Sequence, residues 1–225
     1  MGLLGKAALI LSFDIDESAI AEHDEWHSRE HLQERMSIPG FLRGSRWIST
    51  KGSPGYFVLY EVDQLDTLAS KPYLDRLNNP SAWTSSMMRH YRGMKRGFCT
   101  LTYSAGDGLG AHVSLLRLRP RPEMASALRD WLVNELLPPL TQRSGVIGAH
   151  LFQSELATEM TEEQRIRGKD TAVDWVLMVT GYDQNIIASL AETSLSSKTF
   201  ASHGATEPES GTYLLAHILT ATEIS

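Results

Sequence analysis

The sequence YFVLYEV, residues Tyr56–Val62, decides the fold because a run of the same kind, WVLMVTGY at Trp175–Tyr182, occurs in the second half of the chain. Both runs are short, apolar and rich in β-branched and aromatic residues, which predicts strands. An aspartate follows each run after a short interval, as Asp66 and as Asp183. The two halves of the chain therefore share one pattern.

The first half predicts the order strand, helix, strand, strand, helix, strand. Strands are expected at residues 7–15, 41–48, 56–62 and 98–103, and helices at 18–36 and, interrupted by two prolines, at 65–91. The first helix contains no glycine or proline until Pro39-Gly40 ends it, and Lys51–Gly55 has the composition of a hairpin turn.

The second half predicts the same order again after the glycine-rich linker Ser104–Gly110. Strands are expected at residues 111–118, 146–153, 171–182 and 213–220, with helices at 123–137 and 185–195. Each half thus spells the split βαβ pattern β-α-β-β-α-β. The linker places the boundary between two repeats, 1–106 and 107–225.

This order predicts an α+β protein of two tandem ferredoxin-like units. A sheet of this type carries its two helices on one face, and its other apolar face must be covered. Two such sheets in one chain can cover each other. We therefore expect an intrachain α+β barrel whose lumen can hold a small ligand.

Composition narrows the class of partner. The chain has 225 residues, 42% of them hydrophobic, and a formal net charge of -6, so it has no basic field for nucleic acid or an anionic membrane. The single cysteine, Cys99, excludes an intrachain disulfide and favours a cytoplasmic protein. The expected partner is a small molecule, and pairing of two fused barrels as a homodimer stays open.

The first helix and its exit carry a family resemblance. The segment EWHSREHLQER at residues 25–35 precedes PGFLRGSRW at residues 39–47. This resembles the EthD-like members of the dimeric α+β barrel superfamily, which have a Trp followed by a His on the first helix and then a Pro-Gly-aromatic turn. Their His commonly falls four residues after the Trp, whereas His31 falls five after Trp26. The second half has Trp131 without a corresponding His, so one asymmetric site is expected, in the first half.

His23, His27 and His31 recur every four residues, so they share one stripe of the helix, which Arg35 continues. Three interpretations stay open: a solvated charged face, the wall of a polar pocket, or a metal site to which Glu30 adds a carboxylate. A His-Glu-x-x-His motif is absent from the sequence, so no metal is assigned.

His31 is the first candidate for proton transfer, because an imidazole can take or give a proton at neutral pH. His27 and Glu30 are its expected catalytic partners. The expected substrate-binding residues are Trp26, Arg35, Arg46, Trp47 and His112. Because strand side chains alternate between faces, one of Arg46 and Trp47 should face the lumen, as should at least one of the strand histidines His112, His150 and His217.

The resemblance implies an enzyme acting on a hydrophobic or aromatic metabolite inside the barrel, by histidine acid–base chemistry and with no organic cofactor. Lyase, isomerase, cyclase and cofactor-free monooxygenase chemistry all fit. The alternative is a non-catalytic barrel that binds a small ligand, or haem through an axial His. An insertion in the second half, Glu155–Asp170, is rich in charge and is expected to be a solvated loop.

Overall fold

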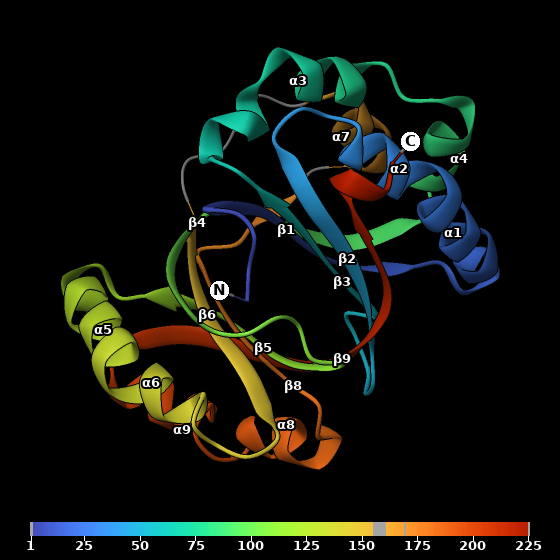
Figure 1. Ribbon diagram of the computed structural model, residues 1–225. Coiled ribbons are helices and arrows are strands. Elements are labelled where there is room, and N and C mark those ends of the chain that lie inside the picture. Colours follow the sequence, from blue (N-terminus) through green and yellow to red (C-terminus); the bar gives the residue numbers. More distant parts are fainter. Residues whose placement is uncertain (1, 155–160, 169, 225) are drawn as a thin grey trace.

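The computed structural model describes residues 2–154, 161–168 and 170–224, and shows an α+β chain with a closed antiparallel barrel of eight strands (Figure 1). The order around the barrel is β1-β3-β2-β9-β5-β8-β6-β4, and β4 pairs back with β1. The bounds are β1 (Ala7–Ile15), β2 (Phe41–Ser49), β3 (Tyr56–Val62), β4 (Tyr91–Gly106), β5 (His112–Pro120), β6 (Val146–Ser154), β8 (Trp175–Gly181) and β9 (Ala205–Thr220). A short strand, β7 (Thr171–Ala172), pairs in parallel with β4.

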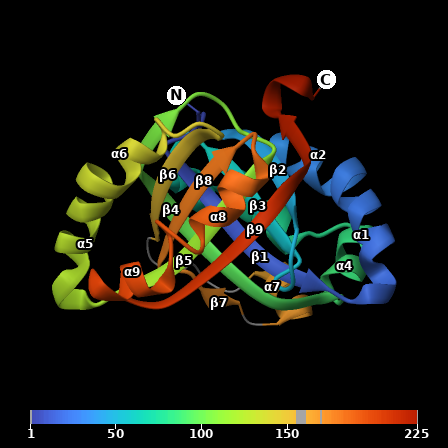
Figure 2. The ribbon, with the colours of Figure 1, turned by 90° about the horizontal axis from the view of Figure 1, so that it is seen from below.

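The helices lie outside the barrel in two groups on opposite flanks (Figure 2). One group is α1 (Ile20–Trp26), the π-helical turn η2 (His27–His31), α2 (Leu32–Met36), α3 (Lys71–Asn78), α4 (Ala82–Met88) and α7 (Glu162–Arg167). The other is α5 (Ala125–Trp131), the π-helical turn η5 (Leu132–Leu136), α6 (Leu137–Leu140), α8 (Gln184–Leu190) and α9 (Ser197–Ser202). Short 3-10 turns are η1 (Glu17–Ala19), η3 (Leu65–Ala69), η4 (Pro122–Met124) and η6 (Ala221–Glu223). No helix of the described residues is long and apolar enough to cross a membrane.

The two halves have the same strand order, β4-β1-β3-β2 in the first and β9-β5-β8-β6 in the second. Two long strands join them. β4 pairs with β1 through residues 91–100 and with β6 through 99–106, and β9 pairs with β5 through 205–214 and with β2 through 213–220. The predicted strands 98–103 and 213–220 are therefore too short. Their glycine-rich and polar extensions have weak strand propensity, and pairing on the barrel makes them strands.

The barrel lumen is a packed hydrophobic core. Its side chains come from the inner faces of both halves and include Ile10, Trp47, Phe57, Met178 and Tyr213. Neighbouring residues on the same strands point the other way and form two further cores beneath the helices. Large apolar side chains from both sheets occupy the lumen, where a ligand space was expected.

The alternation of side chains along the strands shows which of Arg46, Trp47 and the strand histidines face the lumen and which face the helices. Trp47 faces the lumen, where its indole N–H donates to Ser45 Oγ over 3.0 Å. Arg46 faces the helices and donates from Nη1 to the Asp24 carbonyl over 3.0 Å. His150 lies opposite Met178 in the β6–β8 ladder, so it faces the lumen, where burial and Arg43 lower its pKa to about 4. One strand histidine thus faces inward, as expected.

His112 and His217 face outward. His112 shares its strand face with Leu116, a member of the core beneath the second group of helices. His217 lies opposite Arg46 in the β2–β9 ladder, on the helix side of the first half. The structure does not bring His112 to the other expected site residues, because its strand belongs to the other half and its side chain leans toward the other helix group.

The described part of the insertion is also not a solvated loop. Residues 162–167 form α7, which packs against α3 and α4 of the first half, and its Glu163 is buried. A capping box begins the helix: the Thr161 side chain accepts from the N3 backbone N–H, while the Gln164 side chain accepts from the Thr161 N–H over 3.0 Å. Two of its charged residues pair across the halves, Glu163 with Arg35 and Asp170 with Arg96, and the other described ones pair within the insertion. Residues 155–160 and 169 lie outside the described residues.

Candidate active site beneath the first helix

The histidine stripe is buried. His23, His27 and His31 are 0%, 1% and 5% exposed, and Arg35 is 2% exposed. The interpretation of this stripe as a solvated face is therefore wrong. The helix presents the stripe to the sheet because Gly44 of β2 lacks a side chain; a Cβ there would lie 2.4 Å from the Leu32 side chain of α2.

A π-helical turn brings Trp26 and His31 together. The Leu32 N–H bonds to the carbonyl of His27, five residues back, which widens the turn over His27–His31. In such a turn, residues five apart in sequence occupy one face, as residues four apart do in an α-helix. The Trp26 and His31 ring centroids lie 4.4 Å apart. The second half has the same kind of turn at Leu132–Leu136, so the turn is common to both halves, whereas the histidines on it occur only in the first.

Two of the three histidines have hydrogen-bond partners. His23 lies 3.3 Å from Asp24 Oδ1 through Nδ1 and 3.3 Å from the Tyr91 hydroxyl through Nε2. His27 Nε2 lies 3.3 Å from the hydroxyl of Tyr60. The buried Nδ1 atoms of His27 and His31 have no hydrogen-bond partner among the described residues. Of these two histidines, His31 also lines the cavity described below, so it is the better placed to meet a ligand.

Glu30 does not pair with His31. Its Oε1 accepts from the Trp26 indole N–H over 3.2 Å, from Ser81 Oγ over 2.6 Å and from Thr84 Oγ1 over 3.3 Å. The expected catalytic pairing of Glu30 with His31 is wrong, because the N-terminus of α4 engages this carboxylate instead. Glu30 holds the indole of Trp26, against which His31 packs.

A small cavity lies beside His31, between the sheet of the first half and its helices. Its lining residues are Leu9, Leu11, His31, Arg35, Tyr73, Leu77, Met88, Tyr91, Met94, Arg96, Glu163 and Arg167. Its volume of about 20 Å³ holds about one water molecule. Glu163 and Arg167 come from α7, so the insertion of the second half closes a cavity that the first half otherwise builds.

The charged lining residues are tied together through α7. Arg35 Nη2 donates to Glu163 Oε1 over 2.6 Å, and both side chains are buried. Arg167 Nη2 donates to Asp170 Oδ2 over 2.7 Å, and Arg96 lies 3.6 Å from the same carboxylate. Burial would lower the pKa of Arg35, but the Glu163 carboxylate outweighs it and the pKa is raised. Arg35 is therefore a permanent cation in the cavity wall.

Burial and neighbouring positive charge keep His31 in its neutral form. Desolvation, followed by Arg35 and the other histidines, holds the pKa of His31 well below its usual 6.5. Desolvation and its neighbours lower the pKa of His27 in the same direction. Both imidazoles are therefore neutral at pH 7 and can accept a proton. Among the described residues, no three His, Cys, Asp or Glu side chains gather as a set that could hold a metal ion.

The buried histidines predict that the protein loses stability in acid. Below pH 6.5 the unfolded chain binds protons that the folded chain excludes, so the free energy of unfolding falls as the pH decreases. Each such histidine contributes a slope of up to about 1.4 kcal/mol per pH unit. Urea unfolding between pH 7.5 and 5.5 should show a shallower slope for His31→Gln than for the natural sequence. Equal slopes would contradict the neutral state of His31.

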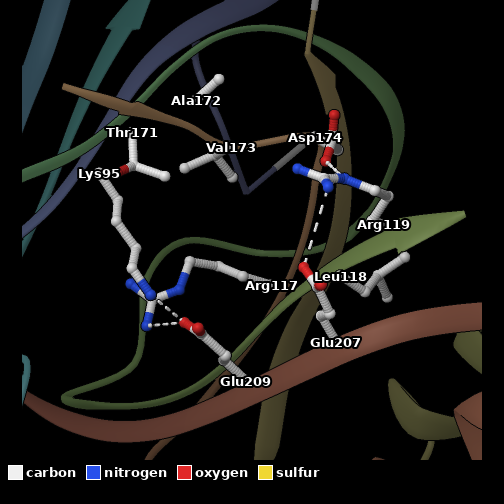
Figure 3. A pocket seen from close by; sticks show the side chains of 10 residues that line it. All are labelled: Lys95, Arg117, Leu118, Arg119, Thr171, Ala172, Val173, Asp174, Glu207 and Glu209. Atoms are coloured by element: carbon white, nitrogen blue, oxygen red, sulfur yellow. Dashed lines mark hydrogen bonds and ion pairs between the residues drawn. The ribbon is translucent and has the colours of Figure 1, made fainter.

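A second pocket lies at one end of the barrel, around Arg117, and has a volume of about 90 Å³. Figure 3 shows Lys95 and Arg117 converging on Glu209, and Arg119 between Asp174 and Glu207. The three cations are thus balanced by three carboxylates. Histidine is absent from this lining, so the pocket is an ion-pair network and a poorer candidate for proton transfer.

The structure brings together some of the expected site residues and adds others. Trp26, His27, His31 and Arg35 lie together beneath the helix. Arg46 lies beside this group, where it contacts the Asp24 carboxylate. Trp47 points to the opposite face of the sheet. Sequence reasoning missed Tyr73, Arg96, Glu163 and Arg167. The run of charges in the insertion was the available signal for the last two, but solvation explained it equally well.

Comparison with known proteins shows the fold. No family model and no curated sequence matches the chain. An anthrone oxidase-like protein has a similar structure, with a TM-score of 0.66 at 11% identity over 100% of this chain and 98% of that one. A protein provisionally assigned as a monooxygenase from Lactobacillus acidophilus has a TM-score of 0.59 at 10% identity, and the match covers 96% of this chain and 96% of that one. A haem-binding protein from Thermus thermophilus has a TM-score of 0.52 at 9% identity, and the match covers 95% of this chain and 92% of that one.

Proposed function

We propose that the protein is an enzyme that removes a proton from a small hydrophobic or aromatic substrate, with His31 as general base and without an organic cofactor. The observation that carries the proposal is the neutral imidazole of His31, whose Nδ1 is unpartnered among the described residues. It lies at a cavity otherwise lined by apolar, tyrosine and arginine side chains and by Glu163. Removal of a proton from a weak C–H or O–H acid needs such a base.

Arg35 supports the same step. Its guanidinium lines the cavity with His31 and remains charged, so an anion formed by proton removal would lie beside a fixed positive charge. Proton removal is the common first step of isomerase, lyase, cyclase and cofactor-free oxygenase chemistry. The resemblance in structure to an anthrone oxidase-like protein favours the oxygenase among these.

We also propose the finer family assignment, an EthD-like protein built as a tandem repeat of ferredoxin-like units with a boundary at 106/107. The π-helical turn supports it. His31 falls five residues after Trp26, and the wider turn places it over the Trp26 ring, where a His four residues after Trp26 would lie in a regular α-helix. The turn Pro39-Gly40-Phe41 supports it too, because Gly40 has φ +90° and Phe41 begins β2 as a buried residue. Cytoplasmic location and pairing of two barrels stay predictions.

Substrate entry requires the cavity to widen. A volume of about 20 Å³ is far below the roughly 300 Å³ or more of a typical ligand pocket. Met88 and Met94 can change rotamer. α7 is held over the cavity by the Arg35–Glu163 ion pair, by a hydrogen bond from the Glu162 N–H to Asn78, and by packing of Ile166. Haem is larger than a small aromatic substrate and would need a greater displacement of these groups, so the geometry favours the smaller substrate.

Anthrone, an aromatic C–H acid, tests the proposal directly. Removal of its C10 proton by His31 gives a carbanion that reduces O₂, and the products are anthraquinone and water. We expect catalysed O₂ uptake in the presence of a chelator, with equal amounts of O₂ consumed and anthraquinone formed. Because the pKa of His31 is lowered, the rate should already be at its plateau at pH 6.5. Uptake at the rate of buffer alone would contradict the proposal.

A further inference from the structure

We propose that the substrate is a hydrophobic carboxylate, whose negative group binds Arg35 in the place that Glu163 occupies in the closed structure. This inference rests on the proposed function for its site, but it concerns recognition and not proton transfer. It is carried by the charge balance of the cavity, by an unused nitrogen of Arg35 and by the origin of Glu163 on α7.

Among the described residues, the cavity holds an excess of positive charge. Arg35, Arg96 and Arg167 line it, and within the described chain they are balanced by Glu163 and Asp170. Three cations thus face two carboxylates, and His31 is neutral. A buried charge without a counter-ion is costly, so a site of this composition favours a ligand with a single negative charge. The pocket at the end of the barrel, with three charges of each sign, has no such excess.

Arg35 has a vacant binding position. Its Nη2 donates to Glu163, whereas its buried Nη1 has no partner among the described residues. A guanidinium binds a carboxylate best through two parallel hydrogen bonds. Glu163 accepts only one such hydrogen bond from Arg35, whereas a substrate carboxylate can accept one from each of the two nitrogens.

Glu163 acts as an internal competitor for this position. It belongs to α7, which is also tied to the first half by a hydrogen bond from the Glu162 N–H to Asn78 Oδ1. Just after α7, Asp170 pairs with Arg167 and lies 3.6 Å from Arg96 of the first half. The closed cavity of about 20 Å³ cannot hold a carboxylate attached to a ring, so α7 must move away when the substrate enters. Movement of α7 removes Glu163 from Arg35 and opens space in one event. The substrate carboxylate then supplies Arg35 with the counter-ion that Glu163 provided.

Benzoate and its neutral isostere benzamide test the inference by calorimetric titration of the full chain. We expect benzoate to bind about tenfold more tightly than benzamide. Glu163→Gln should strengthen benzoate binding by about tenfold more than it strengthens benzamide binding, because it frees α7 for both ligands but removes a carboxylate that competes only with benzoate. In Arg35→Met/Glu163→Gln, which leaves neither position charged, the preference for benzoate should disappear.

Glu162→Gln is the matched control, since it makes the same charge change on the same helix but removes a partner of the exposed Arg165. It should leave benzoate binding unchanged. His31→Gln should also retain benzoate binding, and anthrone carries no carboxylate, so its turnover tests the base alone. Loss of anthrone turnover with benzoate binding intact would therefore count against the proposed function only.

Two results would overturn the inference. One is equal affinity for benzoate and benzamide in both the natural sequence and Glu163→Gln. The other is absence of benzoate binding to Glu163→Gln at concentrations up to about 10 mM, because a dissociation constant above this value does not indicate a specific site. If Glu163→Gln does not fold, comparison of the natural sequence with the double variant decides the same question.

Discussion

Replacing His31 with glutamine is expected to lower the rate of anthrone turnover by about 10²–10⁴-fold, the usual contribution of a general base. Glutamine cannot accept a proton at neutral pH, but its size and polarity allow it to occupy the space beside Trp26. Folding should be retained, since no hydrogen bond of the buried His31 Nδ1 to the described chain is lost. Turnover by O₂ uptake and stability by urea unfolding measure the two effects separately.

His112→Gln is the matched control, because His112 lies on β5 in the other half of the barrel. It should leave turnover unchanged. His27→Gln distinguishes a second possibility, since His27 and the Tyr60 hydroxyl lie 3.3 Å apart and could relay a proton together. If His27→Gln carries the whole loss of rate and His31→Gln none, the base is His27 and the assignment of His31 is wrong.

Replacing Glu163 with alanine is expected to lower the free energy of unfolding by about 3–5 kcal/mol. The change leaves Arg35 buried without the carboxylate that holds it, and burial of an unpaired charge is the main cost. For a chain of this length, such a loss lowers the melting temperature by roughly 6–20 °C. Urea unfolding at pH 7 measures the free energy, and thermal unfolding gives the temperature shift.

The double variant Arg35→Met/Glu163→Leu should recover most of this loss, because it replaces both charges with apolar groups of similar size. Arg165→Ala serves as the control on the same helix; its pair with Glu162 is exposed and worth about 0–1 kcal/mol. A loss for Glu163→Ala no greater than that of the control would show that α7 simply moves away and exposes Arg35 to water. Benzoate should then stabilise that variant more than the natural sequence.

The positions of the strands and the main helices follow from the sequence. Runs such as Tyr56–Val62 are apolar on both faces because the lumen lies on one side and the helices on the other, so the pattern of residues reports local structure directly. The long strands β4 and β9 could not be predicted at their full length. Gly93, Gly97 and Pro208 disfavour strands locally, and only pairing with partners far away in sequence overrides that preference.

The composition of the site depended on contacts that no local pattern reports. The sequence placed His23, His27, His31 and Arg35 on one stripe, but an amphipathic helix with polar residues on one stripe is compatible with a solvated surface or a buried wall. The lumen was the expected pocket, and it is instead filled by side chains such as Trp47 and Phe57. Whether a barrel is hollow depends on how the inner faces of two sheets interdigitate, which is a property of their combined volumes.

By itself, the sequence determined that this protein has two similar halves, that a barrel closes within one chain, and that a histidine-bearing helix distinguishes the first half. These features depend on local hydrophobic periodicity and on turn residues such as Pro39-Gly40. Only the tertiary structure decided that the stripe is buried, that His31 packs on Trp26, and that α7 of the second half closes the cavity with Glu163. The physical reason is that Arg35 and Glu163 are 128 residues apart, and only the packing of both halves makes a buried pair of them.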